Sequence, residues 1–420
     1  MKHLATSLLA AMLVANAAAA PAHLGALPAG RPAWQPTWIS SPQPLWGEDW
    51  VAPLGLPTRL SDVTLRQVVT TSLGGERLRL VVSNEYGSSA LQLGRMTIRA
   101  EGGGEAVAVR FQGRDAAVVV AGARAISDPV ALATAAGQRL QVDLHLPQAT
   151  ALAGFHWGAR EQTLILPGDA VGRRDAAAAQ TSTARGFVTE LLVEATDARG
   201  SVVTLGDSIT DGNGATIGAD QRWPDHLARR LAPLGVAVLN AGISGNRLLS
   251  GGWGDSALAR FERDVLRHRG VRAAIVLLGT NDIGLPGSPF SPGEAPVALD
   301  ALKLGMRQLV EQAHARGVRV VVGTLPPFED ALKGTPLEGH YSPRKEAQRQ
   351  AFNAWLRGGA GFDAVVDFDA VLRDPARPSR LRADLDSGDH LHPGDTGYRR
   401  MAEALDLAAI LGTEARELQP

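Results

Sequence analysis

The first half of the chain alternates apolar and polar residues. Leu78 and Leu80 alternate with Arg77 and Arg79, and a longer run of the same kind spans residues 140–146. Successive side chains of a strand point to opposite faces, so a period of two predicts strands with one buried face. Glycine-rich and Pro-Gly turns separate these runs, and no amphipathic helix interrupts them. We predict that this half is an antiparallel β-sandwich of jelly-roll type.

After Gly200 the pattern changes: short apolar runs alternate with longer stretches in which apolar residues have helical spacing. Short apolar, strand-like runs occur at residues 202–205, 236–240, 273–278, 318–323 and 364–366. Between and after them lie stretches with helical spacing, at residues 223–234, 257–269, 297–316, 343–357 and 396–411. Strands that alternate with helices predict a parallel sheet covered on both faces. We therefore predict a three-layer α/β/α domain of flavodoxin-like type, with about five parallel strands.

The amino terminus has the pattern of an export signal. Lys2 and His3 precede an apolar run at residues 4–14, which an alanine-rich stretch follows up to residue 20. A basic start, a short apolar core and small residues predict a signal peptide at residues 1–20, and hence a secreted or periplasmic protein without stable membrane association. The expected domains are then residues 21–195, a β-sandwich with a Trp- and Pro-rich leading segment, and residues 200–415, a catalytic domain.

Composition and charge narrow the possible functions. Lys and Arg total 42 and Asp and Glu total 43, so no cationic surplus favours binding to nucleic acid. The chain has no cysteine, which excludes disulfides, zinc–thiolate sites, iron–sulfur clusters and a cysteine nucleophile. Hydrophobic residues make up 45% and charged residues 20%, as in a globular protein. The composition gives no indication of the oligomeric state.

Polar residues cluster where the predicted parallel strands end, which is where ligands bind in such sheets. Ser208 follows the first strand on a tight turn and is placed to act as a nucleophile, but its hydroxyl needs a nearby base. His392 is a candidate base, and Asp389 three residues earlier can orient it. Candidate donors to an oxyanion are the N–H of Ser208, the N–H of Gly245 and the amide of Asn281.

Two alternative interpretations involve the same histidine-rich loop. His390 is a rival base, although it lies only one residue from Asp389. His390, His392 and Asp395 are also possible metal ligands, but no third histidine or anchoring glutamate is near them in the sequence. We expect no metal and no cofactor.

The second half resembles the SGNH hydrolases, also called the GDSL esterase/lipase superfamily. Its four blocks are matched in order by Gly206-Asp207-Ser208, Gly245, Gly279-Thr280-Asn281-Asp282 and Asp389-x-x-His392. The resemblance covers residues 202–411 and implies Ser208 as nucleophile, Gly245 and Asn281 as oxyanion donors, Asp389 as orienting residue and His392 as base. A lone Gly-Asp-Ser would be weak, whereas four spaced blocks are a strong signal.

The first half resembles the β-domain of a secreted SGNH subgroup that includes esterases encoded near xylan-degrading enzymes. This resemblance rests on short sequence motifs, among them Leu65-Arg66-Gln67 and Ser83-Asn84-Glu85-Tyr86-Gly87. This resemblance implies a carbohydrate O-acetylesterase acting on acylated plant polysaccharide or a small ester. A broad arylesterase, lipase or lysophospholipase, an acetyltransferase and a non-catalytic carbohydrate-binding protein remain alternatives. Possible substrate-binding residues are Arg247, Trp253, His340, Tyr341, Trp46 and Trp50. For the tryptophans the alternative is that they fill the seam between the two domains.

Overall fold

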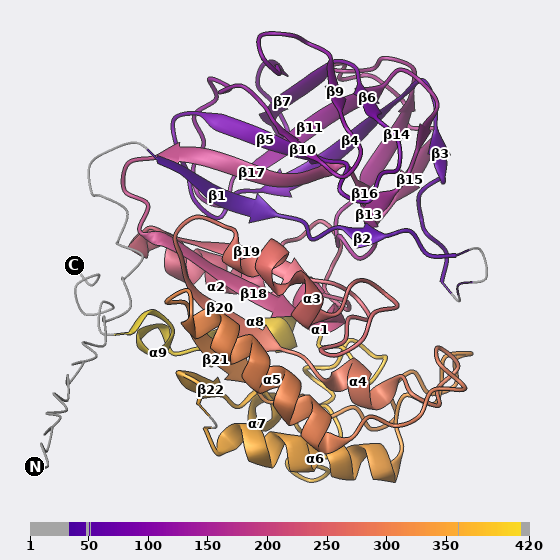
Figure 1. Cartoon of the computed structure of the whole chain (residues 1–420), viewed down its shortest axis with the longest axis vertical. Coiled ribbons are helices and arrows are strands. Elements are labelled where there is room, and N and C mark those ends of the chain that lie inside the picture. Colours follow the sequence, from indigo (N-terminus) through magenta and orange to yellow (C-terminus); the bar gives the residue numbers. More distant parts are fainter. Residues whose placement is uncertain (1–32, 48–49, 51, 360, 413–420) are drawn as a thin grey trace, which may run out of the picture.

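The computed structural model describes residues 33–47, 50, 52–359 and 361–412. Two parts lie one above the other, a β-half at residues 33–195 and an α/β-half at residues 200–412 (Figure 1). The predicted signal peptide and the last residues of the predicted catalytic domain lie outside the described residues. Within the described ranges, none of the helices combines the length and the apolar composition needed to cross a bilayer.

The β-half consists of antiparallel sheets, as the alternating pattern predicts. One sheet has the order β1 (Ala33–Ile39), β17 (Val188–Ala195), β5 (Leu78–Ser83) and β10 (Arg124–Ile126). The other has the order β15 (Gln180–Ser182), β14 (Thr163–Pro167), β4 (Val63–Thr70), β11 (Arg139–Leu146), β7 (Met96–Ala100) and β8 (Val107–Val109). Every pair in both sheets is antiparallel. Leu80 and Leu144 belong to the core formed by their inward faces.

Three smaller sheets complete the β-half. Two are antiparallel pairs, β12 (Thr150–Ala151) with β3 (Arg59–Leu60) and β6 (Leu91–Leu93) with β9 (Ala117–Val119). The third contains β16 (Arg185–Gly186), β13 (Gly154–His156) and β2 (Gln43–Pro44). Figure 1 shows β2 and β13 at the lower edge of the β-half, next to the α/β-half. This third sheet therefore lies where side chains of the β-half can reach the other part.

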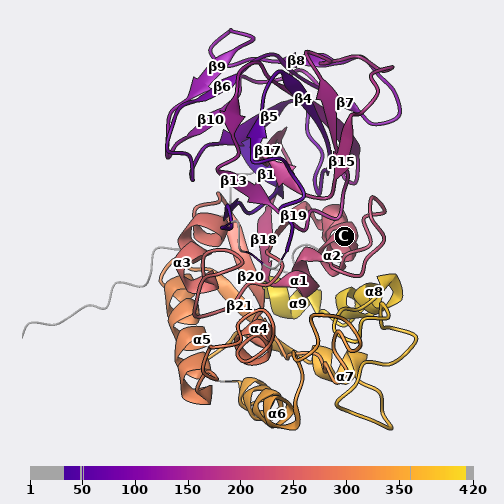
Figure 2. The same cartoon turned by 90° about the vertical axis from the view of Figure 1, so that its right-hand side faces the viewer.

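The α/β-half has one parallel sheet with helices on both faces, which confirms the predicted α/β/α architecture. Its order is β19 (Val236–Gly242), β18 (Gly200–Gly206), β20 (Val271–Leu277), β21 (Arg319–Gly323) and β22 (Ala364–Val366). The helices are α1 (Ser208–Asp211), α2 (Trp223–Leu231), α3 (Ala257–Phe261), α4 (Thr280–Gly284), α5 (Leu299–His314), α6 (Pro343–Arg357), α7 (Phe368–Leu372), α8 (Asp395–Glu403) and α9 (Leu407–Leu411). Figure 2 shows α3 and α5 on one side of the sheet and α2, α8 and α9 on the other. The strands of this sheet are mostly apolar because both faces of the sheet are covered.

Two predicted helices differ from those observed. The stretch at residues 396–411 is two helices, α8 and α9, because the carboxylate of Asp406 accepts the N–H of Ala408 and starts a new helix. The stretch at 257–269 is α3 followed by a π-helical turn at Glu262–Leu266. The short helices α1, α4 and α7 have too few turns to show a period in the sequence.

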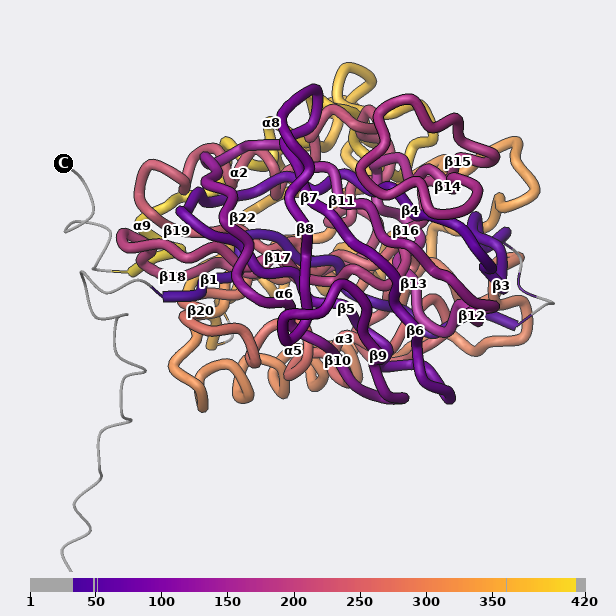
Figure 3. The backbone as a smooth tube through the Cα atoms, turned by 90° about the horizontal axis from the view of Figure 1, so that it is seen from above, coloured from indigo at the N-terminus to yellow at the C-terminus, as the bar shows by residue number. Residues whose placement is uncertain are grey.

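The two halves share a packed seam. Seen from above, β1 and β17 lie over β18 and β19 of the parallel sheet (Figure 3), and β1 is in contact with β19. Several hydrogen bonds cross the seam. Near β1, the Gln35 amide donates to the Arg269 carbonyl at 3.2 Å, and the Val238 N–H donates to the Ser72 hydroxyl at 3.2 Å. The leading segment of the β-half thus includes a strand that lies in the seam.

Candidate active site

The turn after β18 presents Ser208 at the carboxyl edge of the parallel sheet. Asp207 caps helix α1, and its carboxylate accepts the Ile209 N–H at 3.0 Å. Gly206 has no room for a side chain, because a Cβ there would lie 2.0 Å from the Thr210 hydroxyl. A strand, a glycine and an immediate helix start therefore fix the position of Ser208.

Ser208, His392 and Asp389 form a continuous hydrogen-bonded chain. The Ser208 Oγ lies 2.8 Å from His392 Nε2, and His392 Nδ1 lies 2.6 Å from Asp389 Oδ2. The other carboxylate oxygen accepts the backbone N–H groups of Leu391 and His392, at 2.9 and 2.8 Å. Burial alone would raise the pKa of Asp389, but the attraction of His392 and these hydrogen bonds hold it well below its usual range. Asp389 is therefore ionised and placed to orient the imidazole.

The rival base, His390, has a different partner. Its Nδ1 lies 2.5 Å from Asp386 Oδ2, and its backbone has a positive φ of 60°. The Asp395 carboxylate accepts hydrogen bonds from the N–H and the hydroxyl of Thr216 at 2.8 and 2.7 Å. His390, His392 and Asp395 thus point to three separate partners, and the structure does not bring them together as a ligand set.

Two further groups face the space in front of Ser208. Gly245 has a φ of +75°, and a Cβ there would lie 2.2 Å from the Trp253 ring, so only glycine fits. The amide nitrogen of Asn281, on α4, donates to the Asn246 carbonyl at 3.1 Å. An amide nitrogen carries two N–H groups, so the second N–H remains to serve a ligand.

A cavity of about 500 Å³ connects these groups. Residues from the α/β-half that line it include Ser208, Gly245, Asn281, Asp389 and His392. The β-half contributes Ala52, Pro53, Trp157, Gly158, Arg160 and Thr183 to the same lining. The cavity therefore lies between the two halves, with the Ser–His–Asp chain on one wall.

Comparison with known proteins agrees with this arrangement. Residues 204–400 match the model of the GDSL-like Lipase/Acylhydrolase family. This region is a GDSL-like acylhydrolase domain. It is an enzyme domain of the SGNH serine ester hydrolase class, which confirms the resemblance found in the sequence.

Solved structures similar to the chain include three from different bacteria. A lipolytic protein of the G-D-S-L family from Desulfitobacterium hafniense DCB-2 is 21% identical, covers 50% of this chain and 98% of its own, and has a TM-score of 0.37. An aryl esterase of M. smegmatis is 20% identical, covers 52% of this chain and 100% of its own, and has a TM-score of 0.38. A carbohydrate acetylesterase family member from Sinorhizobium meliloti is 17% identical, covers 51% of this chain and 99% of its own, and has a TM-score of 0.39. No curated protein matches the chain.

An aromatic cluster borders the cavity of the acylhydrolase domain. It joins Trp46, Trp50, Phe155 and Trp157 of the β-half to Trp253 and Phe290 of the domain. Trp253 and Trp157 line the cavity, whereas Trp46, which is 7% exposed, packs behind Trp253 and donates its indole N–H to the Trp253 carbonyl at 3.3 Å. Trp50 packs on the Trp253 ring with centroids 5.3 Å apart. Trp157 was missed from the sequence; its place in a Trp-Gly turn after a short strand was the available signal.

The other three predicted substrate-binding residues are dispersed. His340 lines the cavity, and neither of its ring nitrogens has a hydrogen-bond partner among the described residues. Burial, with smaller effects of Lys345 and His392, lowers the pKa of His340 to about 3, so the ring is neutral. The lining residues described for the cavity do not include Arg247 or Tyr341. Arg247 binds Glu294 at 2.7 Å, and Tyr341 packs on Phe328 with ring centroids 6.0 Å apart.

Two buried carboxyl groups support the acylhydrolase site from behind. Asp282 accepts the N–H groups of Leu248 and Leu249 at 2.8 and 3.1 Å, which ties α4 to the chain that follows Gly245. Burial raises the pKa of Asp282 to about 6, against the opposing effect of these two hydrogen bonds. Burial likewise raises the pKa of Asp207 to about 7. Both carboxyl groups therefore lose their protons partly within the neutral pH range.

Proposed function

We propose that the protein is a serine esterase that works through an acyl-enzyme. The observation that carries this proposal is the chain from Ser208 through His392 to Asp389, with its distances of 2.8 and 2.6 Å. In the proposed reaction the Ser208 Oγ bonds to the ester carbonyl carbon while its proton moves to His392 Nε2. The C–O bond to the alcohol then breaks, and the leaving oxygen takes that proton. Water, deprotonated by the same base, releases the acid and restores Ser208.

The proposed oxyanion donors are the N–H groups of Ser208 and Gly245 and the free amide N–H of Asn281. Donors fixed before the reaction stabilise negative charge as it develops on the carbonyl oxygen. All three residues line the same cavity as His392. Asn281 is held by the Asn246 carbonyl, and Asp282 beside it is anchored by two backbone N–H groups. Their position therefore does not depend on the arrival of substrate.

We propose an acetylated carbohydrate as the substrate. Trp157 and Trp253 both line the cavity and pack against each other with ring centroids 5.5 Å apart, and aromatic faces of this kind stack on sugar rings. Neutral His340 supplies ring nitrogens that can exchange hydrogen bonds with sugar hydroxyls. An extracytoplasmic location follows from the signal peptide expected at residues 1–20 and belongs to the same proposal.

A second candidate is an arylesterase or lipase. Apolar side chains also line the cavity, namely those of Leu285, Phe290, Leu332, Leu337 and Leu391. A cavity of about 500 Å³ with this lining has room for an acyl group larger than acetyl. The two candidates share the same chemistry at Ser208 and differ in which part of the ester fills the cavity.

The test combines one variant with two sets of substrates. Ser208→Ala removes the proposed nucleophile, and we expect activity to fall at least about a thousandfold with the fold intact. Native protein and variant are assayed for acetate release from acetylated xylan, pectin and chitin fragments, and on nitrophenyl esters of increasing acyl length. A variant that keeps a tenth of the activity would contradict the mechanism. A rate that rises with acyl length, without acetate release from any polysaccharide, would favour the second candidate.

A further inference from the structure

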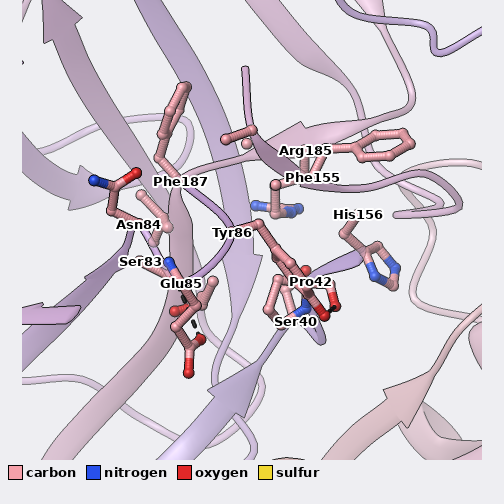
Figure 4. A pocket seen from close by; sticks show the side chains of 15 residues that line it. Ser40, Pro42, Ser83, Asn84, Glu85, Tyr86, Phe155, His156, Arg185 and Phe187 are labelled. Atoms are coloured by element: carbon pink, nitrogen blue, oxygen red, sulfur yellow. Dashed lines mark hydrogen bonds between the residues drawn. The ribbon is translucent and has the colours of Figure 1, made fainter. Parts of the chain in front are cut away.

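A side chain of the β-half contacts the residues that support the proposed oxyanion hole. His156, at the end of β13, lies with its Nε2 2.9 Å from the Asp211 Oδ1, which belongs to α1 just after Ser208. It is one of the residues that line the small cavity drawn in Figure 4, together with Ser40, Pro42 and Arg185. Both members of the pair are buried, with side chains 8% and 2% exposed. The contact therefore joins the two halves behind the cavity wall.

The other oxygen of Asp211 holds the loop that carries Gly245. The N–H and the hydroxyl of Ser244 both donate to Asp211 Oδ2, at 2.9 and 2.6 Å. Gly245 follows directly, and its N–H is a proposed oxyanion donor. An unbroken path of hydrogen bonds thus runs from His156 through Asp211 to Ser244, the residue before the proposed oxyanion donor Gly245.

The hydrogen-bond partners of His156 show where the protons of its imidazole ring lie. His156 Nδ1 lies 2.9 Å from the Ser41 carbonyl, which only accepts, so Nδ1 carries a proton. Nε2 faces a carboxylate oxygen, so a second proton must lie between Nε2 and Oδ1. Within the described ranges, His156 is the only basic side chain paired with the Asp211 carboxylate. Without His156, the buried carboxylate would lose this charge-assisted hydrogen bond.

The fit around this contact leaves little freedom. A Cβ at Gly158, two residues after His156, would lie 2.5 Å from both Asp211 Oδ2 and the Ser244 hydroxyl. Gly158 also lines the active-site cavity. The backbone of the β-half at Gly158 therefore packs closely against Asp211 and Ser244, the two side chains that hold the Gly245 loop.

We infer that His156 is a positioning residue, and that it holds the oxyanion donor Gly245 in place through Asp211 and Ser244. The inference rests on the proposed esterase function. The β-half then completes the catalytic centre of the other half instead of only covering it or selecting substrates. A displacement of about 1 Å in a catalytic group costs on the order of a hundredfold, so we expect loss of His156 to lower kcat by about 10- to 100-fold with little change in KM.

The experiment uses the full chain and nitrophenyl acetate, a substrate too small to depend on polysaccharide recognition. His156→Leu removes both ring nitrogens, whereas His156→Gln keeps a side-chain N–H near the position of Nε2. We expect the order of kcat to be native, His156→Gln, His156→Leu. His145→Leu is the matched control, because it removes a histidine–aspartate contact of the β-half, with Asp62 at 3.1 Å, that does not lead to the site.

A double-mutant cycle tests the path itself. If His156 acts through Asp211, adding His156→Leu to Asp211→Asn lowers kcat by less than twofold further. Melting temperatures are measured for every variant. If His156→Leu does not fold, His156→Gln and Gly158→Ala replace it; Gly103→Ala, where a Cβ meets nothing within 4 Å, is the control for Gly158.

Four results would overturn the inference: kcat within twofold of native, a loss confined to KM, an equal loss in His145→Leu, or full additivity in the cycle. A separate readout distinguishes these from failure of the proposed function. Native protein is treated with a fluorophosphonate, and the labelled residue is identified by mass spectrometry. Native protein that is neither labelled at Ser208 nor active on the ester would refute the proposed function, and the inference with it.

Discussion

Replacing Asp207 by Asn should stabilise the protein, and more at pH 8 than at pH 5. Asp207 caps α1 through one oxygen, which accepts the Ile209 N–H, while its other oxygen is buried without a partner among the described residues. Burial is the main reason that its pKa rises from 3.8 to about 7; Asp282 also raises it, whereas the Ile209 N–H and His392 oppose the shift. Asn keeps the capping oxygen and carries no charge, so it resembles the protonated carboxyl group.

The magnitude follows from the difference between the two pKa values. A shift of about 3 units corresponds to roughly 4 kcal/mol between the two protonation states. Because the folded pKa is raised, the stability contributed by the neutral carboxyl is fully present below pH 3.8 and is lost as the pH rises through about 7. Between pH 5 and pH 8 the native protein should lose on the order of 2–3 kcal/mol relative to Asp207→Asn.

The assay is urea unfolding of both proteins at pH 5 and pH 8, with Tm measured in parallel. Asp264→Asn is the control of opposite sign. Burial alone would raise the pKa of Asp264, but Arg263 and Arg260 hold it below its usual range, so its removal should destabilise the protein at both pH values. A stability difference between native and Asp207→Asn that is equal at pH 5 and pH 8 would refute the reasoning, as would a variant that is less stable at pH 8.

Two further predictions concern activity. Asn281→Ala removes a proposed oxyanion donor and should lower kcat by about a hundredfold to a thousandfold with little change in KM; steady-state kinetics on nitrophenyl acetate test this, and a change in KM alone would contradict it. Trp157→Ala and His340→Phe should lower kcat/KM on an acetylated oligosaccharide more than on nitrophenyl acetate, whereas Trp46→Ala, which opens a cavity in the core, should mainly lower Tm. Equal losses on both substrates for Trp157→Ala would place that ring in a structural role.

The strands of the parallel sheet could be predicted to within about two residues at each end, because they are buried on both faces and therefore read as mostly apolar runs. The predicted run at 236–240 lies within β19 (Val236–Gly242), and that at 364–366 coincides with β22. Ser208 and Asn281 each follow a strand of this sheet, so the sequence predicts that they lie at one edge of it, whereas His392 comes in a later loop and was assigned through the Asp389-x-x-His392 block.

The contacts between the halves could not be predicted in this way. Periodicity shows which face of a strand is buried but not what covers it, so Trp46 and Trp157 look alike in sequence although only Trp157 lines the cavity. His156 and Asp211 are 55 positions apart, one at the end of strand β13 and the other in helix α1, and no spacing rule relates them. The break between α8 and α9 depends on one capping carboxylate, that of Asp406, which the apolar pattern does not reveal.

The pairing of β1 with β17 has a consequence for the order of folding. Ala33 is paired with Ala195, so the four-stranded sheet cannot close until the whole β-half has been synthesised. Only a few residues then separate β17 from β18, which is the second strand of the parallel sheet. Contacts so distant in sequence form slowly, and amino-terminal units fold first as the chain emerges. The β-half can therefore present a finished surface, with β1 exposed, on which β19 of the second half assembles.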